Sequence, residues 1–140
     1  MIYLDTSALV KLIRIEAESE ALSEWLDARI EIPWITSALA EIELTRAIGA
    51  VAPLGLVRVP LVLARLNRFE IDPVIRAAAA AYPDRGLRSL DAVHLATAQT
   101  AGTSAALTAF VVYDRRLGQA AVDLGLPVTT PGSKGADDES

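Results

Sequence analysis

The sequence contains no cysteine, and this absence excludes a disulfide framework and a zinc site built on thiolates. It also contains no run of about 18 apolar residues, so we expect no segment that crosses a membrane. The first residues carry an acidic side chain and no positive charge, which is not typical of a signal peptide. We therefore expect a cytoplasmic protein whose fold depends on a hydrophobic core.

Lysine is scarce, with two residues against eleven arginines, and the net charge is −5 at pH 7. A negative net charge disfavours nucleic-acid binding through a general positive field, although arginine pairs well with individual phosphates. Hydrophobic residues make up 52% of the chain, and we interpret part of this high fraction as an interface, either of a homodimer or with a partner. The length predicts one domain over residues 1–130, and we expect the acidic tail, residues 131–140, to be disordered.

Short apolar segments alternate with helical patterns along the whole chain. Strands are predicted at residues 2–4, 31–35, 68–71, 107–113 and 127–129. Helices are predicted at residues 8–15, 17–30, 38–51, 59–67, 72–82, 89–101 and 114–124. This alternation is typical of the α/β class, in which helices cover both faces of a parallel sheet and ligands bind beyond the carboxyl ends of the strands.

Four carboxylates stand where such a sheet would bring them together, namely Asp5, Glu43, Asp91 and Asp114. Asp5 and Asp114 follow predicted strands, whereas Glu43 and Asp91 lie in predicted helices. Each acid follows or interrupts an apolar run, where a charge is costly unless something compensates it. A divalent cation compensates several acids at once, and Mg²⁺ or Mn²⁺ held by carboxylates suits the hydrolysis of phosphodiester bonds.

Three of these acids also have a purely structural explanation. Asp5 and Asp114 stand where each would cap the N-terminus of a helix. Asp91 stands in the first turn of its helix, where the helix dipole favours a negative charge. Both explanations remain open for each of the three.

Glu43 is harder to explain structurally, because it borders the apolar stripe of its helix. An ion pair with Arg46, three residues further on, is the alternative to a shared site. Glu41 lies two residues earlier and points to a different, more polar face. We therefore choose Glu43 as the glutamate of the shared site.

Several polar side chains near the acids are candidates for binding phosphate or water. The hydroxyl groups are those of Thr6 and Ser7, which serve a helix start equally well. The basic groups are those of Lys11, Arg14, Arg115 and Arg116, for which plain solvent exposure is the alternative. His94, one turn after Asp91, is either a hydrogen-bonded core residue or a metal ligand or general acid.

The segments around the acids resemble the motifs of the PIN-domain family, specifically its VapC-type toxin ribonucleases of prokaryotic toxin–antitoxin pairs. The matching segments are residues 5–11, 36–47, 90–98 and 110–117. They occur in the family's order and extend the resemblance over nearly the whole chain. One departure is Val112, which stands where the family often has Thr or Ser, two residues before the last aspartate, and which removes a hydroxyl that could help to hold Asp114 or a water.

The resemblance implies a three-layer α/β/α fold whose central parallel sheet has about five strands. It implies a Mg²⁺- or Mn²⁺-dependent endoribonuclease in which Asp5, Glu43 and Asp91 hold the ion and Asp114 shares it or helps to recruit a second. It further implies tRNA or rRNA as substrate, a cognate antitoxin and a homodimer. The alternative is a catalytically weak relative that acts by binding RNA or its antitoxin.

Other classes with an acidic pocket on an α/β sheet fit less well. A phosphatase of the haloacid-dehalogenase type needs a second aspartate two residues after the first, where Ser7 stands. A response-regulator receiver domain needs adjacent acids near the first strand and a lysine after the last, and the sequence has neither. A nucleotide-binding domain needs a glycine-rich turn after the first strand, and none follows Asp5.

Overall fold

A five-stranded parallel sheet lies at the centre of the computed structural model, which describes residues 1–133. Its strands are β1 (Ile2–Leu4), β2 (Trp34–Ser37), β3 (Asn67–Phe69), β4 (Ala109–Val111) and β5 (Val128–Thr129). Their order across the sheet is β3-β2-β1-β4-β5, and every neighbouring pair is parallel. The chain thus builds one half of the sheet outward from β1 and then returns to build the other half beside it.

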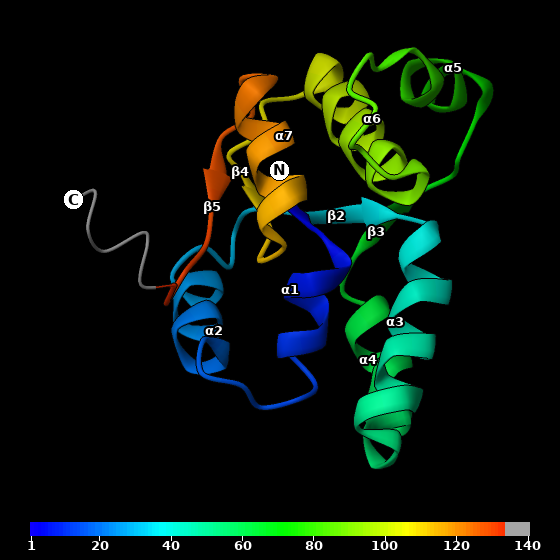
Figure 1. The fold of residues 1–140 in the computed structure, drawn as a ribbon. Coiled ribbons are helices and arrows are strands. Elements are labelled where there is room, and N and C mark those ends of the chain that lie inside the picture. The colour runs from blue at the N-terminus through cyan, green and yellow to red at the C-terminus, as the bar shows by residue number, and fades with distance from the viewer. Residues whose placement is uncertain (134–140) are drawn as a thin grey trace.

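Helices cover both faces of this sheet, as Figure 1 shows. One layer contains α1 (Thr6–Lys11), α2 (Ser19–Asp27), α3 (Leu39–Val51), the 3-10 helix η1 (Pro53–Arg58) and α4 (Val59–Leu63). The other layer contains α5 (Pro73–Ala81), α6 (Ser89–Ser104) and α7 (Arg115–Asp123). The predicted three-layer α/β/α fold is therefore confirmed.

Each face of the sheet has its own hydrophobic core, because successive side chains of a strand point to opposite faces. Ile2 and Leu4 pack into the core under α1, α2 and α3, together with Val111 of β4. Tyr3 and Phe110 belong to the other core, which lies under α6 and α7. All five side chains are fully buried, which explains why these strands are continuous apolar runs rather than alternating ones.

The second strand lies further along the chain than predicted. It begins at Trp34 and includes Thr36 and Ser37, which lie between the predicted strand at 31–35 and the predicted helix at 38–51. The hydroxyl of Thr36 donates a hydrogen bond to the carbonyl oxygen of Leu4 at 2.8 Å, so this buried polar group is satisfied within the sheet. Ser37 still has a capping role, since its Oγ accepts a hydrogen bond from the backbone N–H of Leu39 at 3.1 Å.

The segment after α3 also differs from the prediction. The 3-10 helix η1 occupies most of the stretch between the predicted helices at 38–51 and 59–67, and the helix expected at 59–67 ends at Leu63. Pro53 and Pro60 stand in the first turns of η1 and α4, where a missing N–H costs little. Asn67 pairs with Ile35 in the sheet, so the end of the expected helix is the start of β3.

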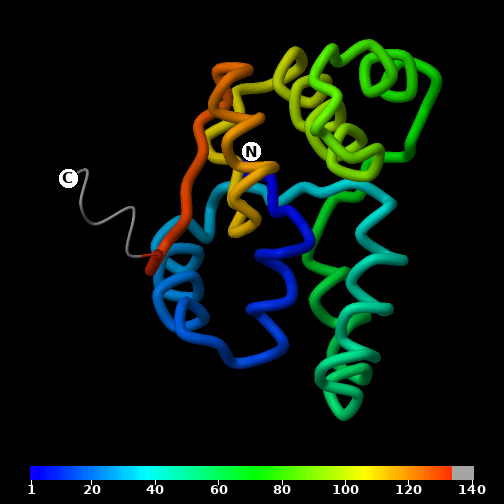
Figure 2. The backbone as a smooth tube through the Cα atoms, viewed as in Figure 1, coloured from blue at the N-terminus to red at the C-terminus, as the bar shows by residue number. Residues whose placement is uncertain are grey.

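The strand order creates a switch point between β1 and β4, the two neighbours from which the halves of the sheet diverge. In Figure 2 the blue backbone of β1 and of the residues that follow it runs through the middle of the molecule. Asp5 directly follows β1, and Asp114 follows β4 by three residues. Their placement at the carboxyl ends of neighbouring parallel strands is the position at which such folds bind ligands.

The last described residues lie against the domain. Tyr113 donates a hydrogen bond from its hydroxyl to the carbonyl oxygen of Pro131 at 2.8 Å. The predicted disordered tail began at residue 131, and its part from 134 to 140 lies outside the described residues.

Candidate active site

Asp5 is held at the carboxyl end of β1 by its own turn. It is the N-cap of α1 and only 5% exposed, and its Oδ2 accepts hydrogen bonds from the backbone N–H of Ser7 at 3.1 Å and from the Ser7 hydroxyl at 2.7 Å. The Ser7 hydroxyl oxygen in turn accepts a bond from the backbone N–H of Tyr113 at 2.9 Å. Ser7 therefore links Asp5 to the segment that carries Asp114, and the cap is compatible with a role in a site.

Glu43 reaches the same region from α3. Its Oε1 accepts hydrogen bonds from the Thr6 hydroxyl at 2.8 Å and from Nε2 of His94 at 2.6 Å. The neighbouring Glu41 is exposed and forms an ion pair with Arg68 at 2.9 Å. The structure thus brings Glu43, and not Glu41, towards Asp5.

His94 links the two acids. It is almost completely buried in α6, and its Nε2 lies 2.6 Å from Oε1 of Glu43 and 3.5 Å from Oδ1 of Asp5. Its Nδ1 lies 2.6 Å from the hydroxyl of Tyr3, which is also fully buried. Both imidazole nitrogens therefore have a hydrogen-bond partner: Nδ1 has the buried Tyr3 hydroxyl, and Nε2 has the carboxylate of Glu43.

The pKa shifts of the His94–Glu43 pair have opposite signs. Burial alone would lower the pKa of His94, but the hydrogen bond to Glu43 and the charges of Asp5, Glu43 and Asp91 raise this pKa above its ordinary value. Burial alone would raise the pKa of Glu43, but the hydrogen bonds from His94 and Thr6 and the charge of His94 lower it. Both shifts favour a charged pair, as expected for a carboxylate that receives a short hydrogen bond from an imidazole.

Asp91 and Asp114 approach from the other helical layer. Asp91 is half-buried in the first turn of α6, and Asp114 is the exposed N-cap of α7, where its Oδ1 accepts from the N–H of Leu117 at 2.9 Å. Burial, and then the negative charges of Asp114 and Asp5, raise the pKa of Asp91 above its ordinary value. Asp114 and Asp5 are therefore each close enough to Asp91 for their charges to repel that of Asp91.

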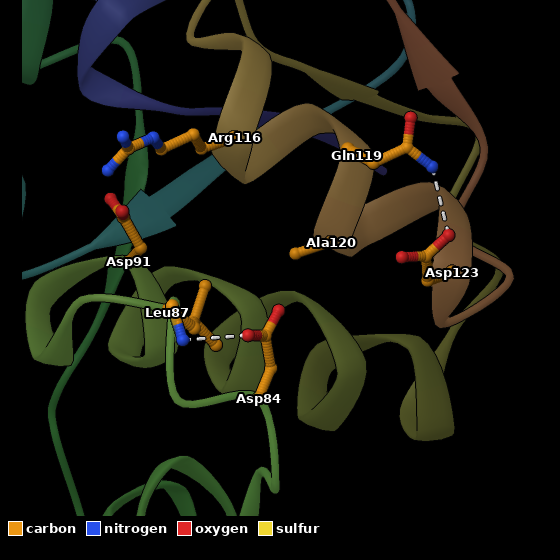
Figure 3. Close-up of a pocket in the computed structure, with 8 residues that line it drawn as sticks. Asp84, Leu87, Asp91, Arg116, Gln119, Ala120 and Asp123 are labelled. Carbon is orange, nitrogen blue, oxygen red and sulfur yellow. Dashed lines mark hydrogen bonds between the residues drawn. The ribbon is translucent and has the colours of Figure 1, made fainter.

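A cleft of about 400 Å³ opens beside Asp91, between α7 and the loop that precedes α6. In Figure 3 the guanidinium group of Arg116 points from α7 towards the carboxylate of Asp91. Asp84 and Asp123 line the same cleft further from Asp91. Arg116 thus stands at the edge of the acid cluster.

The predicted substrate-binding residues lie in different settings. Arg14 and Arg115 are exposed, and Arg115 follows Asp114 directly. Lys11 is buried, and its ammonium group pairs with Glu18 at 2.8 Å and Glu16 at 3.4 Å. The charge of Lys11 is therefore already compensated within the protein.

The four acids lie in one region of the protein, but their side chains are not arranged to bind a metal ion directly. Across residues 1–133, no three or more His, Asp or Glu side chains already stand in an arrangement that could hold a metal ion directly. Asp5 and Glu43 are tied to His94, whereas no hydrogen bond to the side chain of Asp91 is present within this part of the chain. Ligation through water, or a small turn of these side chains, would be needed for a shared ion.

Sequence reasoning undervalued two residues of this region. His94 is three residues after Asp91, a spacing that puts both on one side of α6, and this was its only sequence signal. Tyr3 lies inside an apolar strand and gave no sign that its hydroxyl meets His94 across the fold. Contacts between residues so distant along the chain depend on the strand order, which the sequence pattern does not specify.

The comparisons with known proteins agree with this architecture. The sequence model of the PIN domain matches residues 2–122. Over 132 residues the chain is 70% identical to Ribonuclease VapC35 of Mycobacterium tuberculosis, covering 94% of this chain and 98% of that protein. Over 130 residues it is 39% identical to Ribonuclease VapC46 of the same species, covering 93% and 97%.

The chain therefore belongs to the PIN-domain family. Within that family, its likeness to VapC35 over most of its length makes it a VapC-type toxin. The crystal structure of Mycobacterium tuberculosis VapC20, a sarcin-ricin loop cleaving toxin, superposes with a TM-score of 0.73, covering 94% of this chain and 100% of that chain. At 16% sequence identity this second likeness supports the fold alone. Among the helices of residues 1–133, none combines the length and the apolar character required to cross a bilayer.

Proposed function

We propose that the protein is a divalent-metal-dependent endoribonuclease that acts as the toxin of a toxin–antitoxin pair. The observation that carries this proposal is the convergence of Asp5 and Glu43 on Nε2 of His94, with Asp91 near enough for their charges to interact. The identity of 70% to a protein named Ribonuclease VapC35 supports RNA as the substrate.

The side chains fit Mg²⁺ or Mn²⁺ chemically, because the available donors are carboxylate oxygens and His94 is occupied on both nitrogens. Asp5, Glu43 and Asp91 would hold the ion, and Asp114 would be a further ligand. Mg²⁺ keeps several of its waters, so carboxylates spaced too widely for direct ligation can still serve it. When bound, the ion would lower the pKa of a water molecule and offset negative charge on the phosphate.

The surrounding residues would orient the acids and the substrate. Ser7 holds Asp5 and Thr6 holds Glu43, so each carboxylate has one oriented oxygen. Arg116 and Arg115 would contact RNA phosphates, since a guanidinium pairs with phosphate through two parallel hydrogen bonds. Of the other candidates, Arg14 is exposed and remains available for phosphate, whereas Lys11 is engaged with Glu18 and contributes less.

The substrate class we propose is structured RNA with exposed loops, such as tRNA or rRNA, in the cytoplasm. Sequence-specific recognition of RNA is directed mostly at single-stranded loops, whose bases are accessible. The net charge of −5 leaves local arginines to supply the attraction, so binding should weaken strongly with added salt.

An apolar surface formed by η1 and α4, which pack against each other, is the proposed contact for a partner. Leu54, Val57 and Leu61 on this surface are 94%, 78% and 69% exposed. Exposed apolar patches of this kind mark protein interfaces. We propose that this surface binds the antitoxin or the second copy of a homodimer.

RNA cleavage with and without EDTA separates this function from its alternative, a catalytically weak protein that only binds RNA or antitoxin. Purified protein is incubated with end-labelled tRNA in Mn²⁺, and the fragments are separated on a gel. We expect discrete fragments in Mn²⁺ and intact RNA in EDTA. Retarded but uncut RNA in both conditions would favour the alternative.

A further inference from the structure

A buried chain of hydrogen bonds connects the core of the protein to Glu43. It runs from the hydroxyl of Tyr3 to Nδ1 of His94 at 2.6 Å, and from Nε2 of His94 to Oε1 of Glu43 at 2.6 Å. Tyr3 is fixed in turn by stacking on Phe110, with ring centroids 5.0 Å apart and planes inclined by 11°. The first two members of the chain are nearly inaccessible to solvent, so water does not compete for these bonds.

The chain also crosses between the two helical layers. His94 lies on α6 and Glu43 on α3, which Figure 1 shows on opposite sides of the sheet. Their hydrogen bond therefore passes around the carboxyl ends of the strands. It is a direct side-chain link between the layers at the place where Asp5 also stands.

The direction of these bonds follows from which atoms can donate. Nε2 lies 2.6 Å from an oxygen of the Glu43 carboxylate, which can only accept, so Nε2 carries the imidazole proton. In the neutral imidazole Nδ1 is then an acceptor, and the Tyr3 hydroxyl donates to it. When the imidazole carries both protons, Nε2 is again protonated. In either state Nε2 donates to the carboxylate of Glu43, and a nitrogen that carries a proton is not a metal ligand.

Glu43 is consequently held through one oxygen only. Its Oε1 accepts from both Nε2 of His94 and the Thr6 hydroxyl, which uses the two lone pairs of that oxygen. Its Oε2 accepts no hydrogen bond within residues 1–133. Oε2 is therefore the oxygen left for a cation or for a water molecule bound to one.

We propose that His94 is a positioning residue, which Tyr3 orients and which in turn fixes Glu43 so that Oε2 is presented for metal binding. This inference rests on the proposed function, because it assigns a task to a residue behind a metal site. Side chains that orient a ligand in this way typically change metal affinity by about 10- to 100-fold when they are lost. His94 is thus neither a metal ligand nor only a core residue.

Two substitutions of similar size separate positioning from simple packing. In His94→Gln the amide nitrogen lies near the place of Nε2 and can still donate to Glu43. In His94→Asn the amide lies near the place of Nδ1, so it can meet Tyr3 but cannot reach Glu43. A structural role predicts similar losses for both variants, whereas positioning predicts that only His94→Asn weakens metal binding.

The test measures the Mn²⁺ dissociation constant by calorimetry on the full chain, together with the melting temperature in EDTA. We expect the dissociation constant to rise about tenfold or more in His94→Asn and to stay within about threefold in His94→Gln. Tyr82→Phe is the matched control, since it removes a different hydrogen bond of α6, that from Tyr82 to Gln99 at 2.5 Å, and should leave the constant unchanged. Equal Mn²⁺ affinity in His94→Asn and the natural protein would overturn the inference and leave the proposed function intact.

A second measurement needs no variant. The ¹⁵N chemical shifts of the His94 ring report which nitrogen carries a proton, in EDTA and with Mg²⁺. We expect a proton on Nε2 in both conditions, and an unprotonated Nε2 would overturn the inference. Failure of the natural protein to bind Mn²⁺ at all would instead refute the proposed metal site, and this inference with it.

Discussion

The two sides of the acid cluster are built differently. On the fixed side, formed by Asp5 and Glu43, the carboxylates accept hydrogen bonds from Ser7, Thr6 and His94. On the open side, formed by Asp91 and Asp114, the side-chain hydrogen bond present within residues 1–133 is the helix cap, in which Asp114 accepts from the N–H of Leu117.

The contrast shows how one site can combine precision with adaptability. Oriented carboxylates lower the cost of arranging ligands around an ion, because their rotamers are set before it arrives. Carboxylates that repel one another, as Asp91 and Asp114 do, store unfavourable charge that a cation relieves. We infer that the fixed side supplies geometry and the open side supplies much of the electrostatic attraction for the ion.

Asp5→Asn should cause the largest loss, because it removes one charge from the fixed side and keeps the cap. The amide oxygen of Asn can still accept from Ser7, so the melting temperature in EDTA should change little. We expect the rate of RNA cleavage to fall on the order of a thousandfold. The rate is measured in gel assays with Mn²⁺, and a variant that keeps a tenth of the activity would refute the role of Asp5.

Glu43→Gln and Glu41→Gln compare two glutamates of one helix. Loss of the Glu43 charge should weaken Mn²⁺ binding roughly a hundredfold and abolish the rise in melting temperature that Mn²⁺ gives the natural protein. Glu41 is exposed and paired with Arg68, so its substitution should change neither value. Calorimetry measures the Mn²⁺ affinity, and thermal unfolding measures the rise in melting temperature. Equal values for the two variants would contradict the assignment of Glu43 to the metal site.

Arg116→Gln probes the open side, where its guanidinium points towards Asp91. Loss of a charged contact to a phosphate should raise the KM for RNA roughly tenfold, with a smaller change in kcat. Arg76→Gln removes a positive charge from α5, away from the cluster, and is the control for net charge. An equal rise in KM for both variants would mean that only the overall charge matters.

Asp91→Asn should stabilise the metal-free protein while it inactivates the enzyme. Burial and the charges of Asp114 and Asp5 raise the pKa of Asp91, so its ionised form at neutral pH destabilises the fold. Removing that charge should increase the free energy of unfolding, by an amount that solvent screening of this half-exposed group keeps small. Urea unfolding in EDTA at pH 7 measures this difference, and a loss of stability would contradict the open side as a source of repulsion.

The smallest expected effect is a pH dependence of the fixed side. The lowered pKa of Glu43 contributes stability above its ordinary value of 4.5, and this contribution is lost as the pH falls through the lowered pKa. The raised pKa of His94 contributes stability below its ordinary value of 6.5, and this contribution is lost as the pH rises through the raised pKa. In EDTA, Glu43→Gln should therefore lower the free energy of unfolding most at pH values between these two numbers. A loss of stability that instead grows steadily above pH 8 would contradict a charged Glu43–His94 pair.

The sequence allowed the fold and most of this cluster to be predicted, for identifiable reasons. Alternation of strands and helices is a local pattern, and Asp5 and Asp114 directly follow the apolar segments predicted as strands at 2–4 and 107–113, so their place at the carboxyl edge needed no tertiary knowledge. The predicted extent of β2 was wrong because the Thr36 hydroxyl donates its hydrogen bond to Leu4 of the neighbouring strand β1, and not to the helix that follows β2.

Other features depended on how the chain folds and could not be derived from local patterns. His94 meets Tyr3 at a separation of 91 residues. Lys11 meets Glu18 because the segment after α1 turns back towards that helix. A buried histidine and a paired lysine have the same local sequence signature as a ligand and a phosphate-binding group. Only their burial and partners distinguish these roles.

The central claim is that Asp5, Glu43 and Asp91 share one divalent ion at the carboxyl edge of the sheet. Anomalous scattering from a crystal soaked in Mn²⁺ would test it most directly. The account predicts a strong peak within direct or water-mediated reach of all three carboxylates, with His94 still bonded to Glu43. A peak bound elsewhere, or none at a concentration that saturates cleavage, would contradict it.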